Sequence, residues 1–147
     1  MHISNKCSIA IHCLIFIHEY EHETKVTSEL LSLSTGCNPV TIRNLLSALK
    51  KDGILTVKPG TGGAAFAVPP EDITLYRICN AVDSGAIDKM VGIHAAPSPF
   101  CPVGRNIRVV LDDTYETLRA DMIASMKSVT MDKILVDYHE KIQKKPE

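Results

Sequence analysis

The stretch between residues 25 and 68 constrains the fold most, because it places two short amphipathic helices on either side of a tight turn. The turn reads Gly36-Cys37-Asn38-Pro39. Gly36 can adopt the left-handed backbone that ends a helix, and Asn38 can cap the helix that follows. Pro39 suits a first helical turn, where its missing amide is not needed. The pattern therefore predicts that one helix ends and another begins within this turn.

Both flanking helices carry an apolar side. Thr27 is the expected N-cap of the first helix, which begins at Ser28 and has Glu29 near its positive end. In the second helix the apolar residues recur at the three-and-four spacing of a buried stripe. The expected apolar residues are Val26, Leu30, Leu31 and Leu33 in the first helix, and Ile42, Leu45, Leu46 and Leu49 in the second. The outer side of the second helix is polar and basic, with Thr41, Arg43, Asn44, Ser47, Lys50 and Lys51.

A β-hairpin is expected after these helices. Gly53 ends the second helix, residues 54–57 have the composition of a strand, and residues 65–68 are its antiparallel return. The glycines of the connecting loop, residues 58–63, allow backbone amides to approach a phosphate closely, and Lys58 adds positive charge. This order predicts a winged helix-turn-helix. The same glycines could form a nucleotide-phosphate cradle, but no GK[ST] signature or following helix accompanies them.

The rest of the chain predicts a mainly α-helical fold around this small hairpin. With 147 residues and 45% hydrophobic content, the chain can bury a core. The apolar run at 9–17 is too short to cross a membrane and is expected to be a core helix. Further helices are expected at 71–82, 103–127 and 130–142, and prolines interrupt the segment 86–101.

These elements predict a winged helix-turn-helix domain over residues 1–83, a sensor-type loop over 84–102, and a long helix with a C-terminal helix over 103–147. The long helix has an apolar seam that favours packing against a partner helix. The expected dimerisation residues are Leu111, Tyr115, Leu118 and Met122. The alternative is that this seam packs on its own domain.

The order of these motifs resembles the Rrf2 family of bacterial transcription regulators, which includes IscR, NsrR and CymR. The resemblance extends over almost the whole chain, and the segment 101–104 is most similar to a YwnA-like branch. Thr41 and Pro59 stand where the family often has Tyr and Arg, so no operator sequence is carried over. The motifs that carry the resemblance are Ile3-Ser4-Asn5-Lys6, Asn38-Pro39, Lys51-Asp52-Gly53-Ile54-Leu55, the wing Gly60-x-x-Gly63, and Cys101-Pro102-Val103-Gly104.

In a helix-turn-helix the second helix enters the major groove of DNA, and its first residues meet base edges. The candidates for base contacts are Asn38, Val40, Thr41, Arg43 and Asn44, with Ser47 on the same face. The candidates for phosphate contacts are Lys50, Lys51, Lys58, Thr61 and Gly62. A homodimer would read an inverted repeat with half-sites about one helical turn apart, and would repress by blocking promoter access.

The net charge of -1 conceals a local excess of cations. Between residues 38 and 63, Arg43, Lys50, Lys51 and Lys58 are opposed only by Asp52, and Glu29 is expected to lie elsewhere. If each cation neutralises one phosphate, a dimer gives a log-log salt slope of about -7 for DNA binding.

Among possible sensors a thiol switch is preferred to an iron-sulfur cluster, and the alternative is that Cys37 is only a turn residue and Cys101 an inert, half-buried thiol. Cluster-binding relatives carry three cysteines before the long helix, whereas this chain has Cys101 alone, with Ala95 and Ile107 at the flanking positions, so an iron-sulfur cluster is not expected. Cys37 and Cys101 each precede a helix, whose positive end favours thiolate. Cys7, Cys13 and Cys79 are expected to be packing residues. An odd number of cysteines, five, favours a reducing cytoplasm over a disulfide framework.

Three rival interpretations stay open at this point. His18 and His22 are four residues apart and could share a metal if both are helical, giving a metal-sensing regulator. Cys101 and His94 could form a nucleophilic pair, although no orienting residue or oxyanion motif accompanies them. The winged unit could also contact protein instead of DNA, which the basic outer face of the second helix argues against.

Overall fold

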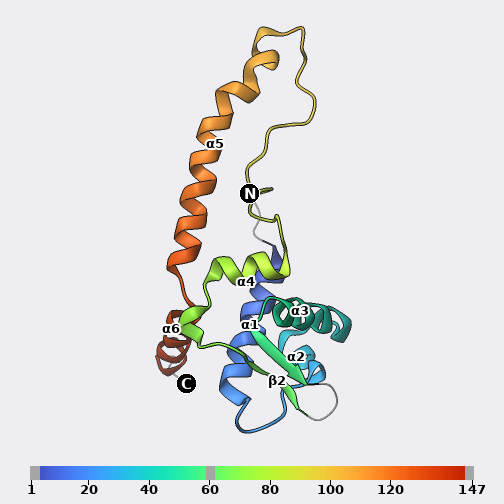
Figure 1. The fold of residues 1–147 in the computed structure, drawn as a ribbon, viewed down its shortest axis with the longest axis vertical. Helices are drawn as coiled ribbons and strands as arrows, with labels where there is room; N and C mark the ends of the chain where they lie inside the picture. The colour runs from blue at the N-terminus through green and yellow to red at the C-terminus, as the bar shows by residue number, and fades with distance from the viewer. Residues whose placement is uncertain (1–3, 59–61, 145–147) are drawn as a thin grey trace.

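The computed structural model describes residues 4–58 and 62–144. A body of short helices and one hairpin is joined to a long helix that extends away from it as an arm, with the segment after α4 running beside it (Figure 1). The elements are α1 (Asn5–Tyr20), α2 (Ser28–Thr35), α3 (Pro39–Lys51), β1 (Leu55–Lys58), β2 (Gly63–Phe66), the 3-10 helix η1 (Pro70–Asp72), α4 (Leu75–Val82), α5 (Pro102–Ser128) and α6 (Met131–Gln143). In the described part of the chain, no helix is both long enough and apolar enough to cross a membrane.

Helix α1 lies at the centre of the body and contacts α2, α3, α4 and β2. Its buried residues follow helical spacing, so that one side of the helix is in the core: Cys7, Ala10, Cys13, Leu14 and Ile17. The prediction of a core helix around residues 9–17 is confirmed. The three predicted packing cysteines, Cys7, Cys13 and Cys79, are all buried.

The helices that flank the turn are confirmed, with one error. Helix α3 buries all four residues of its predicted stripe. In α2 only Leu31 is buried, and Leu33 is 82% exposed. Leu33 is two residues beyond Leu31, which on a helix places it on nearly the opposite side. The prediction that Leu33 belongs to the apolar side of this helix is therefore wrong.

The hairpin is present, but its strands are displaced from the predicted ranges. Strand β1 pairs with β2 in antiparallel register from Leu55 opposite Phe66 to Lys58 opposite Gly63. The return strand starts earlier than predicted because Gly63 adopts a left-handed φ of 66° and the Ala64 amide donates a 2.9 Å hydrogen bond to the Val26 carbonyl. This bond holds the hairpin against the start of α2.

The helix predicted at 71–82 is divided into η1 and α4. Ile73 and Thr74 between them are extended, and the Thr74 hydroxyl accepts a hydrogen bond from the Arg77 amide as the N-cap of α4. The extended pair is held by the α5–α6 junction, because the Met131 amide donates to the Ile73 carbonyl and Thr74 pairs with Thr130. The apolar spacing alone did not reveal this contact with a distant part of the chain.

The two C-terminal helices are confirmed to within a residue or two of their predicted bounds. The end of α5 and the start of α6 join the same core through Met126, Met131 and Leu135. The His139 ring of α6 lies 2.5 Å from the Glu19 carboxylate of α1. Helix α5 ends at Ser128, so Val129 does not continue the helical seam.

Replacing Gly63 by Ala should destabilise the protein more than replacing Gly36 by Ala. Both glycines have a left-handed φ, which costs an L-residue about 1–2 kcal/mol. A Cβ on Gly36 has nothing within 4 Å, whereas a Cβ on Gly63 would lie 2.8 Å from the Val26 backbone nitrogen. Urea unfolding of the two variants measures the difference as a larger fall in midpoint for Gly63→Ala. Equal losses would show that the contact with Val26 is unimportant.

Candidate nucleic-acid interface

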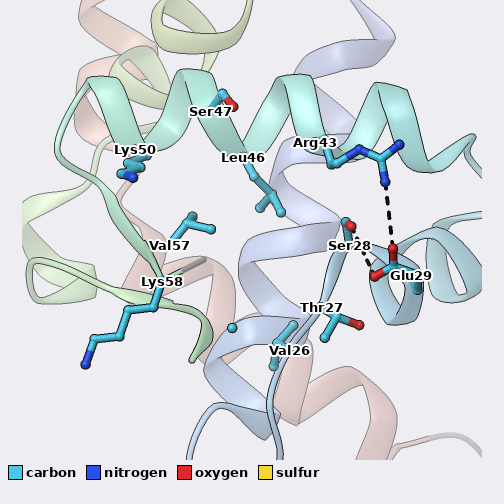
Figure 2. Close-up of a pocket in the computed structure, with 11 residues that line it drawn as sticks. Val26, Thr27, Ser28, Glu29, Arg43, Leu46, Ser47, Lys50, Val57 and Lys58 are labelled. Atoms are coloured by element: carbon cyan, nitrogen blue, oxygen red, sulfur yellow. Dashed lines mark hydrogen bonds and ion pairs between the residues drawn. The ribbon is translucent and has the colours of Figure 1, made fainter. Parts of the chain in front are cut away.

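The outer face of α3 and the hairpin border an open groove of about 420 Å³ (Figure 2). Its apolar floor is formed by Val26, Leu46 and Val57. Lys50 and Lys58 lie at one end of the groove, and Arg43 and Glu29 lie at the other. The cationic side chains that line the groove are Arg43, Lys50 and Lys58, and Glu29 is the acidic residue among those that line it.

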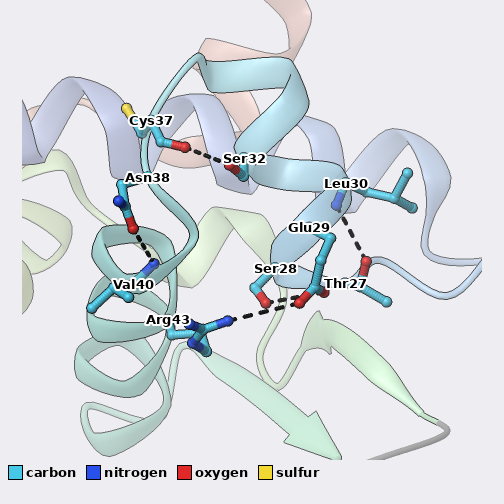
Figure 3. Close-up of polar contacts among 9 residues, drawn as sticks. All are labelled: Thr27, Ser28, Glu29, Leu30, Ser32, Cys37, Asn38, Val40 and Arg43. Carbon is cyan, nitrogen blue, oxygen red and sulfur yellow. Dashed lines mark hydrogen bonds and ion pairs between the residues drawn. The ribbon is translucent and has the colours of Figure 1, made fainter.

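Hydrogen bonds in the turn before α3 fix the position of this groove (Figure 3). Thr27 accepts from the Leu30 amide at 3.2 Å and caps α2, and Asn38 accepts from the Val40 amide at 2.8 Å and caps α3. Between them, the Ser32 hydroxyl donates to the Cys37 carbonyl. The Ser32 and Asn38 side chains thus hold the turn itself, and the predicted N-caps, Thr27 of α2 and Asn38 of α3, are both confirmed.

The four buried residues of α3 decide which of its side chains face outward. The residues predicted to contact DNA from the turn and α3 are all exposed: Asn38, Val40, Thr41, Arg43, Asn44, Ser47, Lys50 and Lys51. Val40 is 54% exposed, which is unusual for an apolar residue so close to a core helix. The Asn38 side-chain oxygen is already used by the cap, which leaves its amide group as the only free donor of that side chain.

Of the predicted wing residues, Lys58 and Gly62 are exposed, and Thr61 lies outside the described residues. Lys58 ends β1 directly opposite Gly63. A Cβ on Gly62 would lie 2.3 Å from the Cβ of Lys58, so the chain can pass this close to the lysine only without a side chain at that position.

The charge pattern of the interface differs from the prediction at two positions. Glu29 does not lie elsewhere, because its carboxylate is 3.7 Å from the Arg43 guanidinium. Asp52, the acid expected to oppose the lysines, instead binds Arg77 at 2.7 Å. Within residues 4–58 and 62–144, Lys50, Lys51 and Lys58 form no ion pair. The sequence did not reveal Glu29 as part of this surface, although its place in the first turn of α2 was correctly predicted.

The five cysteines fall into distinct environments. Cys101 is exposed at the N-terminus of α5, where the backbone amides of Gly104 and Val103 lower its pKa. Burial raises the pKa of Cys13 to about 12. Cys37 is half-buried in the turn before α3 and packs against the core, and its thiol donates to the Thr35 carbonyl at 3.8 Å. Cys101 is therefore the thiol best placed to react with a reagent from solvent.

The predicted histidine metal pair does not have the required geometry. Helix α1 ends at Tyr20, so His22 lies in the turn beyond it and the four-residue spacing no longer places both rings on one helical face. His22 is 89% exposed, and His18 packs edge-on against Phe66. Among the described residues, no three His, Cys, Asp or Glu side chains are grouped to hold a metal ion.

The predicted dimerisation residues of α5 are not equivalent. Leu118 is 47% exposed, Leu111 and Tyr115 are partly exposed, and Met122 packs against the core of its own body. Three valines that the seam did not include are also more than half exposed on this helix: Val103, Val109 and Val110. Much of the apolar surface of the arm is therefore uncovered in one chain.

Known proteins match both the sequence and the fold. The family model for Rrf2, described as an iron-dependent transcriptional regulator, matches residues 3–137. YwnA of Bacillus subtilis (strain 168), provisionally named an HTH-type transcriptional regulator, is 34% identical over 133 residues, covering 90% of this chain and 96% of YwnA. A crystal structure from Lactobacillus plantarum, provisionally assigned as a transcriptional regulator, has a TM-score of 0.73 and 28% identity, covering 91% of this chain and 89% of that one.

A more distant structure supports the fold alone. IscR from T. potens has a TM-score of 0.70 at 16% identity, and the match covers all of this chain and 93% of that one. The mainly helical fold with its two-stranded hairpin is thus the winged helix-turn-helix of these regulators. The chain belongs to the Rrf2 family of transcriptional regulators.

Proposed function

We propose that this regulator binds double-stranded DNA as a homodimer on an inverted-repeat operator and represses transcription by blocking promoter access. The observation that carries the proposal is the outer face of α3, which is exposed along its length and borders a groove with cations at both ends. The first residues of α3 meet base edges, and Lys50, Lys51 and Lys58 contact the backbone. YwnA, an HTH-type relative, supports the same role.

The proposed homodimer rests on the exposed apolar side chains of the arm, helix α5. Helix α5 has 27 residues, far more than its packing on the body requires, and its apolar residues outside the body are uncovered. Because burial of apolar surface favours association, a second copy of this helix is the partner we propose. A two-fold axis between the arms presents two α3 helices to successive major grooves on one side of the duplex.

The loop at residues 84–102 is the proposed sensor, with Cys101 as its reactive group. We propose that a peroxide oxidises Cys101 and the Cys37 thiol of the other subunit, forming one S–S bond and transferring two electrons and two protons to the peroxide. Such a bond would displace α3 and release DNA. The family is described as iron-dependent, but in the part of the chain that the structure describes no three His, Cys, Asp or Glu side chains are grouped to hold an iron centre.

Two alternatives to parts of this proposal remain, one for the signal and one for the partner. A small ligand at the loop before α5 could replace the thiol as the signal, and the winged unit could bind protein. An electrophoretic mobility shift with random duplex DNA distinguishes a DNA-binding regulator from a protein-binding module, because the protein-binding module would not shift the duplex in a salt-dependent manner.

Lys50→Ala combined with Lys58→Ala should weaken binding to random and selected duplexes by similar factors. Two lost phosphate contacts per subunit lower the salt slope of a dimer by about 3.6, at roughly 0.9 per phosphate. Fluorescence anisotropy over a range of salt concentrations measures the slope. Lys141→Ala on α6 removes one exposed cation from outside the groove and should leave the slope unchanged. An unchanged slope in the double variant would remove these lysines from the interface.

Leu118→Arg should convert the dimer into a monomer, because it places a charge in the proposed apolar contact between arms. Leu118 is nearly half exposed in one chain, so the substitution should leave the unfolding midpoint of the body little changed. Analytical ultracentrifugation gives the mass of each protein. A wild type that sediments as a monomer, or a variant that stays dimeric, would contradict the proposed arm contact.

Mild peroxide should produce a covalent dimer of the wild type on non-reducing electrophoresis, and Cys101→Ser should produce none. Because the amides at the start of α5 lower the Cys101 pKa, its thiolate persists to a lower pH than that of an ordinary cysteine. The rate of crosslinking should therefore increase as the pH rises through that lowered pKa, and level off above it. Cys37→Ser removes the second thiol of the proposed disulfide and should also give no covalent dimer. Equal monomer bands in wild type and Cys101→Ser would end the redox proposal.

A further inference from the structure

The geometry points to Glu29 as the residue that positions Arg43 for reading a base, and so as a determinant of sequence specificity. This inference rests on the proposed function, since it concerns how the same surface recognises duplex DNA. Glu29 comes from α2 and Arg43 from α3, so the contact joins the two helices of the motif beyond their shared turn. In Figure 2 both side chains lie at the same end of the groove.

The Glu29 carboxylate is held in place from two directions. One of its oxygens accepts a 3.2 Å hydrogen bond from the Ser28 hydroxyl, and the other lies 3.7 Å from Nη1 of Arg43. The hydrogen bond from its own backbone amide, followed by that from Ser28, lowers the Glu29 pKa. The group is therefore a carboxylate at neutral pH, and Figure 3 shows it between Ser28 and Arg43.

A fixed negative charge on a surface that meets phosphates opposes binding in general. Glu29 is 69% exposed and Arg43 is 54% exposed, so burial in the core does not account for their pairing. The carboxylate does, however, make Arg43 a poorer partner for any nearby phosphate, because part of the guanidinium charge is already compensated. It reduces sequence-independent binding by this residue.

The same contact leaves Arg43 able to recognise a base. A guanidinium carries five N–H donors in a rigid planar fork, and the Glu29 carboxylate, 3.7 Å from Nη1, attracts one edge of this fork while the donors of the other edge can still meet a base. Two such donors match O6 and N7 of guanine in the major groove. Glu29 therefore lowers the entropy that Arg43 loses when it meets a base, while it disfavours the competing phosphate contact.

The test uses Glu29→Gln, which removes the charge at nearly constant shape, and Glu29→Asp, which keeps the charge at the start of α2 but is too short to reach Arg43. The probes are a duplex selected by the wild type from a random-sequence library and an unselected random duplex. In both variants the ratio of the two affinities should fall about tenfold, as expected when a bidentate base contact worth about 1–3 kcal/mol is weakened. The log-log salt slope for binding of random duplex should also be steeper in Glu29→Gln than in the wild type, by about 0.9 per subunit.

Three controls separate this role from a structural one. Glu140→Gln removes an exposed carboxylate on α6 and should keep the wild-type ratio. Unfolding midpoints show whether each variant is folded, and Glu29→Asp is expected to keep the helix-dipole contribution. In an Arg43→Ala background, Glu29→Gln should have no further effect on the ratio, since the residue through which it acts is gone.

The outcomes also separate this inference from the proposed function. A wild type that binds no duplex in a salt-dependent manner would overturn the proposed function itself. A wild type that selects a duplex, together with Glu29→Gln and Glu29→Asp variants that keep its affinity ratio, would overturn only the role of Glu29. A fall in the ratio that persists in the Arg43→Ala background would overturn the positioning of Arg43.

Discussion

The burial of one side of α3 in the core, against α2, β1, α4 and α1, is the interaction on which the rest of this molecule depends. Ile42, Leu45, Leu46 and Leu49 are nearly or fully buried, and each leucine or isoleucine removed from water contributes about 1.5–3 kcal/mol. That burial fixes the rotation of the helix about its axis. The polar residues of α3 therefore face away from the core, and three of them, Arg43, Ser47 and Lys50, line the groove beside the hairpin.

Much of this surface could be predicted from the sequence because its determinants are local. Caps, the left-handed Gly36 and the spacing of apolar residues each act within a few positions, and they placed α2 and α3 correctly. The split before α4, the partner of Asp52 and the contact between Glu29 and Arg43 were missed because each joins residues far apart in the chain. Leu33 was misplaced because a short helix with many leucines does not define its buried side uniquely.

The cysteines illustrate how the same side chain serves different purposes in this fold. Three of them are buried in the core, and there burial raises the pKa of Cys13 to about 12. Cys101 stands at the opposite extreme, exposed at a helix start whose amides favour the thiolate. This chain of a family described as iron-dependent thus has one exposed cysteine, Cys101, directly before α5.

The short bridge between Thr74 and Thr130 has a mechanical consequence. Backbone hydrogen bonds on both sides of it, from Leu75 to Val129 and from Met131 to Ile73, fasten the root of α5 to the start of α4. From α4, Arg77 grips both the carboxylate and the carbonyl of Asp52 at the end of α3. These bonds therefore restrict rotation of α5 relative to the body at its C-terminal end. In the proposed dimer, these contacts would set the distance between the two α3 helices.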